Sequence, residues 1–232
     1  MSHKRLNSYK GRLSSSQISE GMNLAHHNAI RLLEDAQILY EKNRYPSAAT
    51  LSILSIEESG KKRILRQLSL VSSDEELNNI WKDYRSHVRK NVQWLLLDMV
   101  QQGARKLDDF ETMFDPSAEH PYFLDNIKQI SVYTDCLGLA HWSNPSEVID
   151  KLLAKYLILI AQALSSGREV TTKEIDLWKK HLKNSGVSFR SQKEALLHWY
   201  YDMENNGLLP PDHNITDVMK WLGFDFGDIS SD

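Results

Sequence analysis

A run of charged residues interrupts a segment whose pattern is otherwise that of a buried helix. On a helical wheel of about 100° per residue, the apolar residues of this segment share one arc: Leu51, Leu54, Ile64, Leu65 and Leu68. Glu57, Glu58 and Lys61 fall on that same arc. Because an unpaired charge is costly to bury, the sequence predicts that all three side chains have partners in the interior.

The preceding helical segment offers such partners. Asn28, Arg31 and Asp35 are spaced i, i+3 and i+7 and form one stripe beside its apolar residues. If the two helices pack antiparallel across a short turn, Arg31 would pair with Glu58, and Asp35 with Lys61. Two interpretations remain open: an ion-pair network that fixes helix register, or a ligand-binding or catalytic core.

A third segment carries the best candidate for acid–base chemistry. His87 and Asn91 are i, i+4 neighbours, so the amide is expected to orient the imidazole ring. Lys90 flanks that face. A histidine beside cations can act as the general acid or base of RNA cleavage while a lysine steadies the phosphate charge. The alternative is an ordinary helix histidine with no part in chemistry.

Other chemistries lack their motifs. The chain has no His-Glu-x-x-His, no pair of Glu-x-x-His motifs, no cysteine pair for zinc and no phosphate-binding glycine-rich loop. The adjacent pair His26-His27 diverges by about 100° on a helix and is not expected to share a metal. We therefore expect neither a metal nor a cofactor.

Composition is that of a globular domain, with 232 residues, 25% charged residues and a net charge of −3. The single cysteine, Cys136, fits a reducing compartment, and the N-terminus resembles no secretory signal. The most apolar stretch, 152–164, is too short to span a bilayer. These features predict a soluble cytoplasmic protein without a membrane partner.

Charge is uneven along the chain: residues 61–106 are rich in Lys and Arg, and residues 202–232 are acidic.

Hydrophobic periodicity predicts an all-α chain with little β signal. The expected helices are 20–42, 46–71, 73–99, 122–133, 145–164, 172–183, 191–205 and 216–222. Pro46 suits a first helical position, and Ser73 with Glu76 forms a capping box. The expected organisation is a flexible N-terminus (1–18), a helical bundle (19–167) and a helical C-terminal extension (168–232).

Several motifs in this order resemble the AbiV family of bacterial abortive-infection proteins. The motifs that carry the resemblance are Glu20-Gly21, Asn28-Ala29 through Asp35-Ala36, Arg44 to Ala48, Glu57 to Lys61, Arg85-x-His87-x-x-Lys90-Asn91, and Val132 to Asp135 followed by Trp142 and Pro145. Together they cover roughly residues 20–165. Residues 168–232 fall outside the resemblance.

The resemblance implies a HEPN-like antiparallel helical bundle and a role in defence against phage. Many HEPN proteins are metal-independent ribonucleases that work as homodimers, with four to six residues between an Arg and the His that follows it. Here Lys82 keeps that spacing to His87, and Arg85 does not. The cation of such a site would then be Arg31, Lys90 or a residue of a second subunit.

Expected partners are RNA or a ribosome-associated target and a phage-encoded activator. The alternative is a non-enzymatic helical protein that binds a phage or translation component.

Overall fold

The computed structural model describes residues 8–115, 117–186, 188–210 and 213–224, and it confirms the all-α class. The α-helices of this part are α1 (Ser15–Glu41), α2 (Tyr45–Leu68), α3 (Asp74–Arg85), α4 (His87–Lys90), α5 (Leu96–Gln101), α6 (His120–Val132), α7 (Pro145–Val148), α8 (Lys151–Leu164), α9 (Thr172–Leu182), α10 (Phe189–Asn205) and α11 (Ile215–Leu222). Two 3₁₀ segments, η1 (Asn91–Leu95) and η2 (Leu107–Phe114), and two short strands, β1 (Cys136–Leu137) and β2 (His141–Trp142), complete it.

The long helices α1 and α2 form an antiparallel hairpin, as expected from the short turn between them. Asn43 turns the chain with φ 58°, and Pro46 lies in the first turn of α2. Helix α1 begins at Ser15, five residues before the predicted start. Its capping box explains the difference: the amide of Gln17 donates to Ser14 Oγ, and the amide of Ser14 donates to Gln17 Oε1.

The segment 1–18 was expected to be loosely ordered. Residues 1–7 lie outside the described residues, whereas residues 15–18 are helical. Residues 8–14, before α1, are bound to the last turn of α3. Arg85 donates to the carbonyl oxygen of Tyr9, and the indole of Trp81 donates to the carbonyl oxygen of Gly11. This short lead segment therefore closes one end of the bundle.

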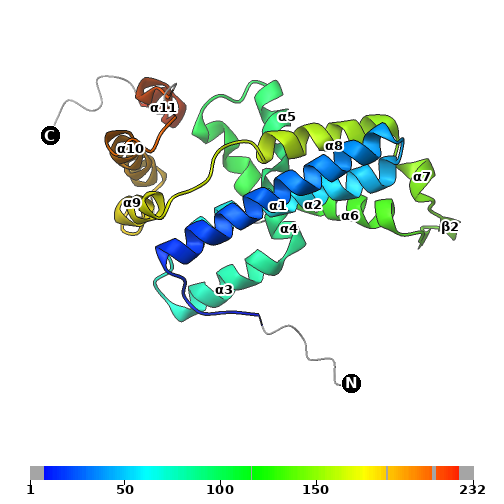
Figure 1. Ribbon diagram of the computed structural model, residues 1–232, viewed down its shortest axis with the longest axis horizontal. Coiled ribbons are helices and arrows are strands. Elements are labelled where there is room, and N and C mark those ends of the chain that lie inside the picture. The colour runs from blue at the N-terminus through cyan, green and yellow to red at the C-terminus, as the bar shows by residue number, and fades with distance from the viewer. Residues whose placement is uncertain (1–7, 116, 187, 211–212, 225–232) are drawn as a thin grey trace.

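Helix α2 lies at the centre of the bundle and is packed by α1, α6 and α8 (Figure 1). The largest core cluster joins side chains from these helices: Leu33 and Ala36 of α1, Ile53 and Ile56 of α2, Leu124 and Ile127 of α6, and Leu157, Ile160 and Ala161 of α8. Because neighbours cover α2 on several sides, Ser52, Ser55 and Ser59 are buried, and Ser55 Oγ donates to the carbonyl oxygen of Ala29 at 2.7 Å.

The predicted helix 73–99 is not continuous. It begins as expected, with Ser73 and Glu76 forming the capping box, but α3 ends at Arg85. Ser86 is extended (φ −79°, ψ 125°) and is the N-cap of α4, because its hydroxyl accepts from the amide of Arg89. A serine that bonds a nearby backbone amide competes with helix continuation. The expectation of one helix over 73–99 is therefore wrong, and with it the regular i, i+4 relation of His87 and Asn91.

A further break divides the predicted helix 145–164. Residues 145–164 form α7 and α8 instead of one helix, because Ile149 is extended and Asp150 caps α8 by accepting from the amide of Leu153 at 2.8 Å. The irregular stretch before them contains the β1–β2 hairpin, in which Cys136 pairs with Trp142. This hairpin projects from the end of the bundle near α7 (Figure 1).

The C-terminal helices α9, α10 and α11 form the predicted helical extension. They pack on one another through Leu177, Trp199 and Met203 in one cluster and Leu197, Val218 and Leu222 in another. Helix α9 also rests on α1, where the hydroxyls of Ser19 and Thr172 lie 3.2 Å apart. In the described part of the chain, no helix has the length and apolar character needed to cross a membrane.

Candidate functional site

The centre of the candidate site is the buried carboxylate of Glu57. Its side chain is only 3% exposed. Three donors reach it: His87 Nδ1 lies 2.6 Å from Oε2, Lys90 Nζ 3.2 Å from Oε2, and Lys128 Nζ 2.7 Å from Oε1. A carboxylate buried among two ammonium groups and an imidazole is compensated, and removing the carboxylate or either ammonium group would leave charge unbalanced in the interior.

Gly60 allows α4 to reach Glu57. A Cβ built on Gly60 would lie 2.0 Å from the carbonyl oxygen of Lys90, which is far inside van der Waals contact. Only a glycine fits at this crossing of α2 and α4, and it is tolerated despite the cost of glycine within a helix. The close approach places His87 and Lys90, at the two ends of α4, against a carboxylate one turn earlier on α2.

His87 is held at one nitrogen while much of its ring remains accessible. The side chain is 57% exposed although Nδ1 contacts the buried carboxylate. When Nδ1–H donates to Glu57, Nε2 of the neutral ring keeps its lone pair. A histidine oriented by a carboxylate in this way can take a proton from a substrate hydroxyl and give it back later.

Asn91 does not orient the imidazole ring, contrary to the sequence-based expectation. Its side chain is completely buried, and neither its amide nitrogen nor its amide oxygen has a hydrogen-bond partner among the described residues. Because Ser86 ends α3 and Asn91 begins η1, the i, i+4 relation with His87 is no longer that of one regular helix. The ring is oriented by Glu57 instead.

Lys128 belongs to the cluster and was missed in the sequence. It lies on α6, 71 residues from Glu57, and it also pairs with Asp125 at 2.8 Å. Burial alone would lower the pKa of Lys128, but hydrogen bonds to Asp125 and Glu57 raise that pKa above its ordinary value. The ammonium group is therefore kept charged beside Glu57.

The expected pairing of Glu58 and Lys61 with α1 is not present. Lys61 Nζ pairs with Glu58 on the same helix at 2.5 Å and lies 5.4 Å from the centroid of the Tyr84 ring. Arg31 pairs with Asp35 at 3.0 Å and donates to Asn28 Oδ1, so the stripe on α1 satisfies itself near the surface. Side chains of this stripe are too exposed to need interior partners, and i, i+4 pairing within a helix suffices.

The residues of the charged run thus differ in burial. Glu57 is buried, as the wheel predicted, whereas the pair of Glu58 and Lys61 is partly exposed. Of the predicted site residues, the structure brings together Glu57, His87 and Lys90. It leaves Asn28, Arg31 and Asp35 as a separate surface group. Among the described residues, no group of three or more His, Cys, Asp or Glu side chains could hold a metal ion.

Comparison with known proteins gives one match. Residues 17–166 match the family model HEPN_AbiV, described as AbiV. The match spans α1 to α8, and so includes Glu57, His87, Lys90 and Lys128, and it stops before α9. No curated protein and no solved structure matches the chain.

Proposed function

The chain belongs to the AbiV family of HEPN proteins, and we propose from this premise that it is an abortive-infection effector that blocks phage propagation by cleaving RNA. The observation that carries the proposal is the pairing of an exposed imidazole with a buried carboxylate, His87 Nδ1 to Glu57 Oε2 at 2.6 Å. The family supports the role in defence, and this geometry supports the chemistry.

The proposed reaction uses the ribose of the RNA as the nucleophile. His87 Nε2 takes the proton of a 2′-hydroxyl, and the oxygen attacks the adjacent phosphorus. The bond from phosphorus to the 5′-oxygen breaks, and the departing 5′-oxygen takes a proton from water, which leaves a 2′,3′-cyclic phosphate and a 5′-hydroxyl. This reaction requires a base, an acid and stabilisation of negative charge, so no metal has to be invoked.

His87 is the one member of the cluster that we assign to contact with RNA. The Lys90 side chain is 8% exposed and faces Glu57, and Asn91 is fully buried. Both are therefore assigned as positioning residues, Lys90 through its ion pair with Glu57 and Asn91 within the packing of η1. The cation that stabilises the phosphate would come from a second subunit in this account.

A homodimer fits this requirement and is part of the proposal. Helix α8 exposes Leu152 and Leu159, which are two turns apart and so lie on the same side of the helix. Large apolar side chains on an exposed helix face are typical of surfaces that a partner covers. We propose that a second copy packs on α8.

The experiment that tests the proposed activity uses the full chain and total RNA. Purified protein is incubated with cellular RNA in the presence of EDTA, with and without extract of phage-infected cells as a source of the activator. The proposal predicts fragments that end in 2′,3′-cyclic phosphate. Intact RNA under both conditions, for a protein that still protects cells from phage, would overturn it.

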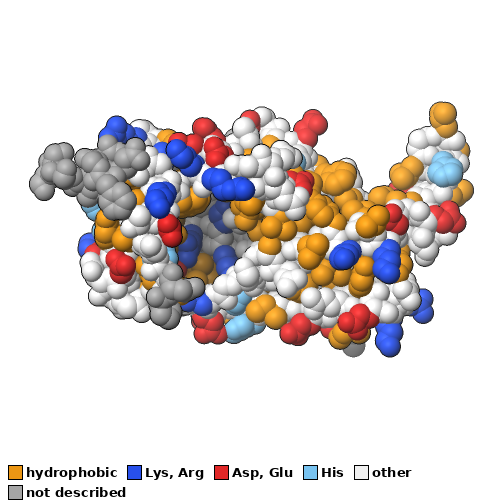
Figure 2. Space-filling model, turned by 90° about the horizontal axis from the view of Figure 1, so that it is seen from above, with side chains coloured by type: hydrophobic (Ala, Val, Ile, Leu, Met, Phe, Trp, Pro, Cys, Tyr) orange, Lys and Arg blue, Asp and Glu red, His pale blue; other side chains and the backbone are white. Residues whose placement is uncertain are grey.

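A second candidate function is binding without catalysis. The observation that favours it is the β1–β2 hairpin, which projects from the bundle and carries apolar side chains at its surface (Figure 2). Leu139 at its tip is fully exposed, and Trp142 on β2 is also largely exposed. In this account the hairpin docks on a phage protein or a translation component, and the Glu57 cluster serves only to hold α4 and α6 on α2.

A further inference from the structure

A second, strongly cationic site lies on the other side of α2. A cavity of about 650 Å³ opens between the bundle and the C-terminal extension, and Figure 2 shows a hollow there with lysine and arginine side chains around it. The charged side chains that line it are Lys62, Arg63 and Arg66 of α2, Arg168 of the linker, and Glu174 of α9. Four cations therefore face one carboxylate.

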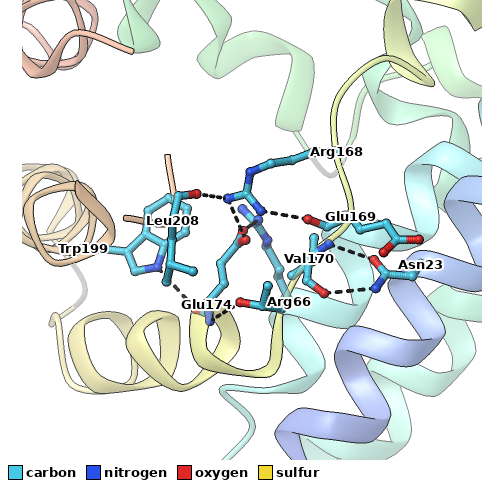
Figure 3. Close-up of polar contacts among 9 residues, drawn as sticks. Asn23, Arg66, Arg168, Glu169, Val170, Glu174, Trp199 and Leu208 are labelled. Carbon is cyan, nitrogen blue, oxygen red and sulfur yellow. Dashed lines mark hydrogen bonds and ion pairs between the residues drawn. The ribbon is translucent and has the colours of Figure 1, made fainter. Parts of the chain in front are cut away.

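The single carboxylate is shared by two of these cations. Glu174, which is 3% exposed, pairs with Arg66 at 2.6 Å and with Arg168 at 3.0 Å (Figure 3). The remaining two form no ion pair with a carboxylate in the described part of the chain, although the charge of Asp83 acts on Arg63 and that of Glu174 acts on Lys62. Lys62 donates to His26 Nδ1, and Arg63 donates to the carbonyl oxygen of Arg89. The cavity therefore holds an excess of positive charge.

Burial makes this excess costly. Desolvation lowers the pKa of Lys62, Arg63 and Arg66 below the ordinary values. Ser59 also lines the cavity, and its buried hydroxyl has no hydrogen-bond partner among the described residues. Cations that are partly desolvated beside an unsatisfied hydroxyl form a site that an anion would complete.

The C-terminal extension builds one wall of the cavity and is fixed in place. The linker is tied to α1, because Asn23 donates to the carbonyl oxygen of Val170 at 3.0 Å and accepts from its amide at 2.8 Å (Figure 3). The guanidinium of Arg66 packs 5.2 Å from the ring centroids of both Trp178 and Trp199. Arg168, Glu174 and Trp178 line the cavity and come after residue 166, where the family match ends.

We propose that this cavity binds a small solute that carries several negative charges on phosphate groups, and that Lys62, Arg63 and Arg168 contact those groups. Guanidinium and ammonium groups suit phosphate oxygens, and the volume lies in the usual range of small-molecule sites, about 300–1,000 Å³. The lining comes from α1, α2, η1, α5, η2, α8, the linker and α9. Walls from so many segments suit a compact ligand better than a nucleic acid strand.

Direct titration calorimetry of the full chain tests this proposal. The probes are sodium tripolyphosphate, ATP and a single-stranded RNA decamer, each against the wild type and a Lys62→Gln/Arg63→Gln variant. A second double variant, Arg190→Gln/Lys220→Gln, removes two exposed charges of the extension and serves as the matched control. Thermal unfolding curves report whether each variant is folded.

The proposal predicts saturable binding of tripolyphosphate, ATP or both by the wild type, at one site per chain. If only tripolyphosphate binds, the ligand of the cavity is a free polyphosphate. If only ATP binds, the ligand is a nucleotide. The Lys62→Gln/Arg63→Gln variant should bind at least about tenfold more weakly, since it loses two charged donors to the phosphate groups, and the control should bind like the wild type. No binding of either small probe overturns the proposal, as does binding of the RNA decamer alone.

A footprint of the wild type keeps the proposal testable if the double variant does not fold. Lysines are acetylated briefly with and without the bound probe, and the modified positions are read by mass spectrometry. Lys62 should react several-fold more slowly in the presence of the probe, while exposed Lys220 should react equally in both samples. Equal reaction of Lys62 with and without the probe overturns the proposal.

Discussion

Gly60 on α2 and Lys90 on α4 meet backbone to backbone. The space at Gly60 is so small that any Cβ would collide with the Lys90 carbonyl oxygen. Gly60 therefore sets the distance between the two helices, and through it the contacts of His87 and Lys90 with Glu57.

The first prediction follows from that contact. Gly60→Ala should lower the free energy of unfolding by about 1–3 kcal/mol, as overpacking of an interior does. Gly21→Ala is the matched control, because Gly21 is also helical and an added Cβ would find ordinary contact, 3.5 Å from Leu65 Cδ1. The control should be neutral or stabilising by up to about 1 kcal/mol. Equal effects of the two changes in urea unfolding would contradict the account.

Glu57→Gln should be strongly destabilising. It removes the negative charge from a site in which two nearly buried ammonium groups face the carboxylate. Breaking a buried pair in this way costs about 3–5 kcal/mol. Glu58→Gln, one residue along the helix, disturbs only the partly exposed pair with Lys61 and should cost less than about 1 kcal/mol. Urea unfolding of both variants measures the difference, and a smaller loss for Glu57→Gln than for Glu58→Gln would be inconsistent with the cluster.

Tyr156 should make stability fall at alkaline pH. Burial, with a hydrogen bond from its hydroxyl to Asp98, raises the pKa of Tyr156 to about 12 in the folded chain. An unfolded tyrosine titrates near about pH 10. The unfolded state therefore loses this proton first, so the contribution is intact below about pH 10 and is lost as pH rises toward 12.

The measurement is the free energy of unfolding between about pH 9 and 12. Tyr156→Phe should make the fall of that free energy with pH shallower, because the side chain no longer titrates. An unchanged slope in the Phe variant would show that the hydroxyl of Tyr156 does not carry this dependence.

The proposed homodimer predicts a specific effect of charge on α8. Leu152→Asp together with Leu159→Asp should shift the protein from dimer to monomer in sedimentation velocity at micromolar concentration. Leu139→Asp also removes an exposed leucine, but from the hairpin tip, and should leave the dimer intact. A monomeric wild type would contradict the proposal that a second subunit supplies the cation that stabilises the phosphate.

The sequence predicted the main helices because their periodicity and end signals are local. Pro46 and the capping box of Ser73 marked helix starts correctly. The box of Ser14 and Gln17 carries the same kind of signal and was overlooked. The break at Ser86 was hidden, because a single serine does not by itself end a helix and the competing bond to Arg89 becomes evident only in the folded chain.

The candidate site was only partly predictable. Glu57 stood out because a charge on an apolar arc needs partners, and this expectation holds. Its partners could not be found by pairing adjacent helices, since Lys128 is 71 residues away and reaches Glu57 only through the packing of α6 on α2. The cavity that Lys62 and Arg63 line could not be predicted, because it exists only where Arg168 of the linker and Glu174 of α9 lie beside α2.

The most direct test of the central claim compares RNA ends in phage-infected cells that express the wild type or His87→Ala. The account predicts fragments with 2′,3′-cyclic phosphate ends in the wild type. It predicts their loss, together with loss of protection from phage, in a His87→Ala protein that remains folded and present at the same level. The same fragments and the same plaque count with His87→Ala would contradict the assignment of His87 as the acid–base group.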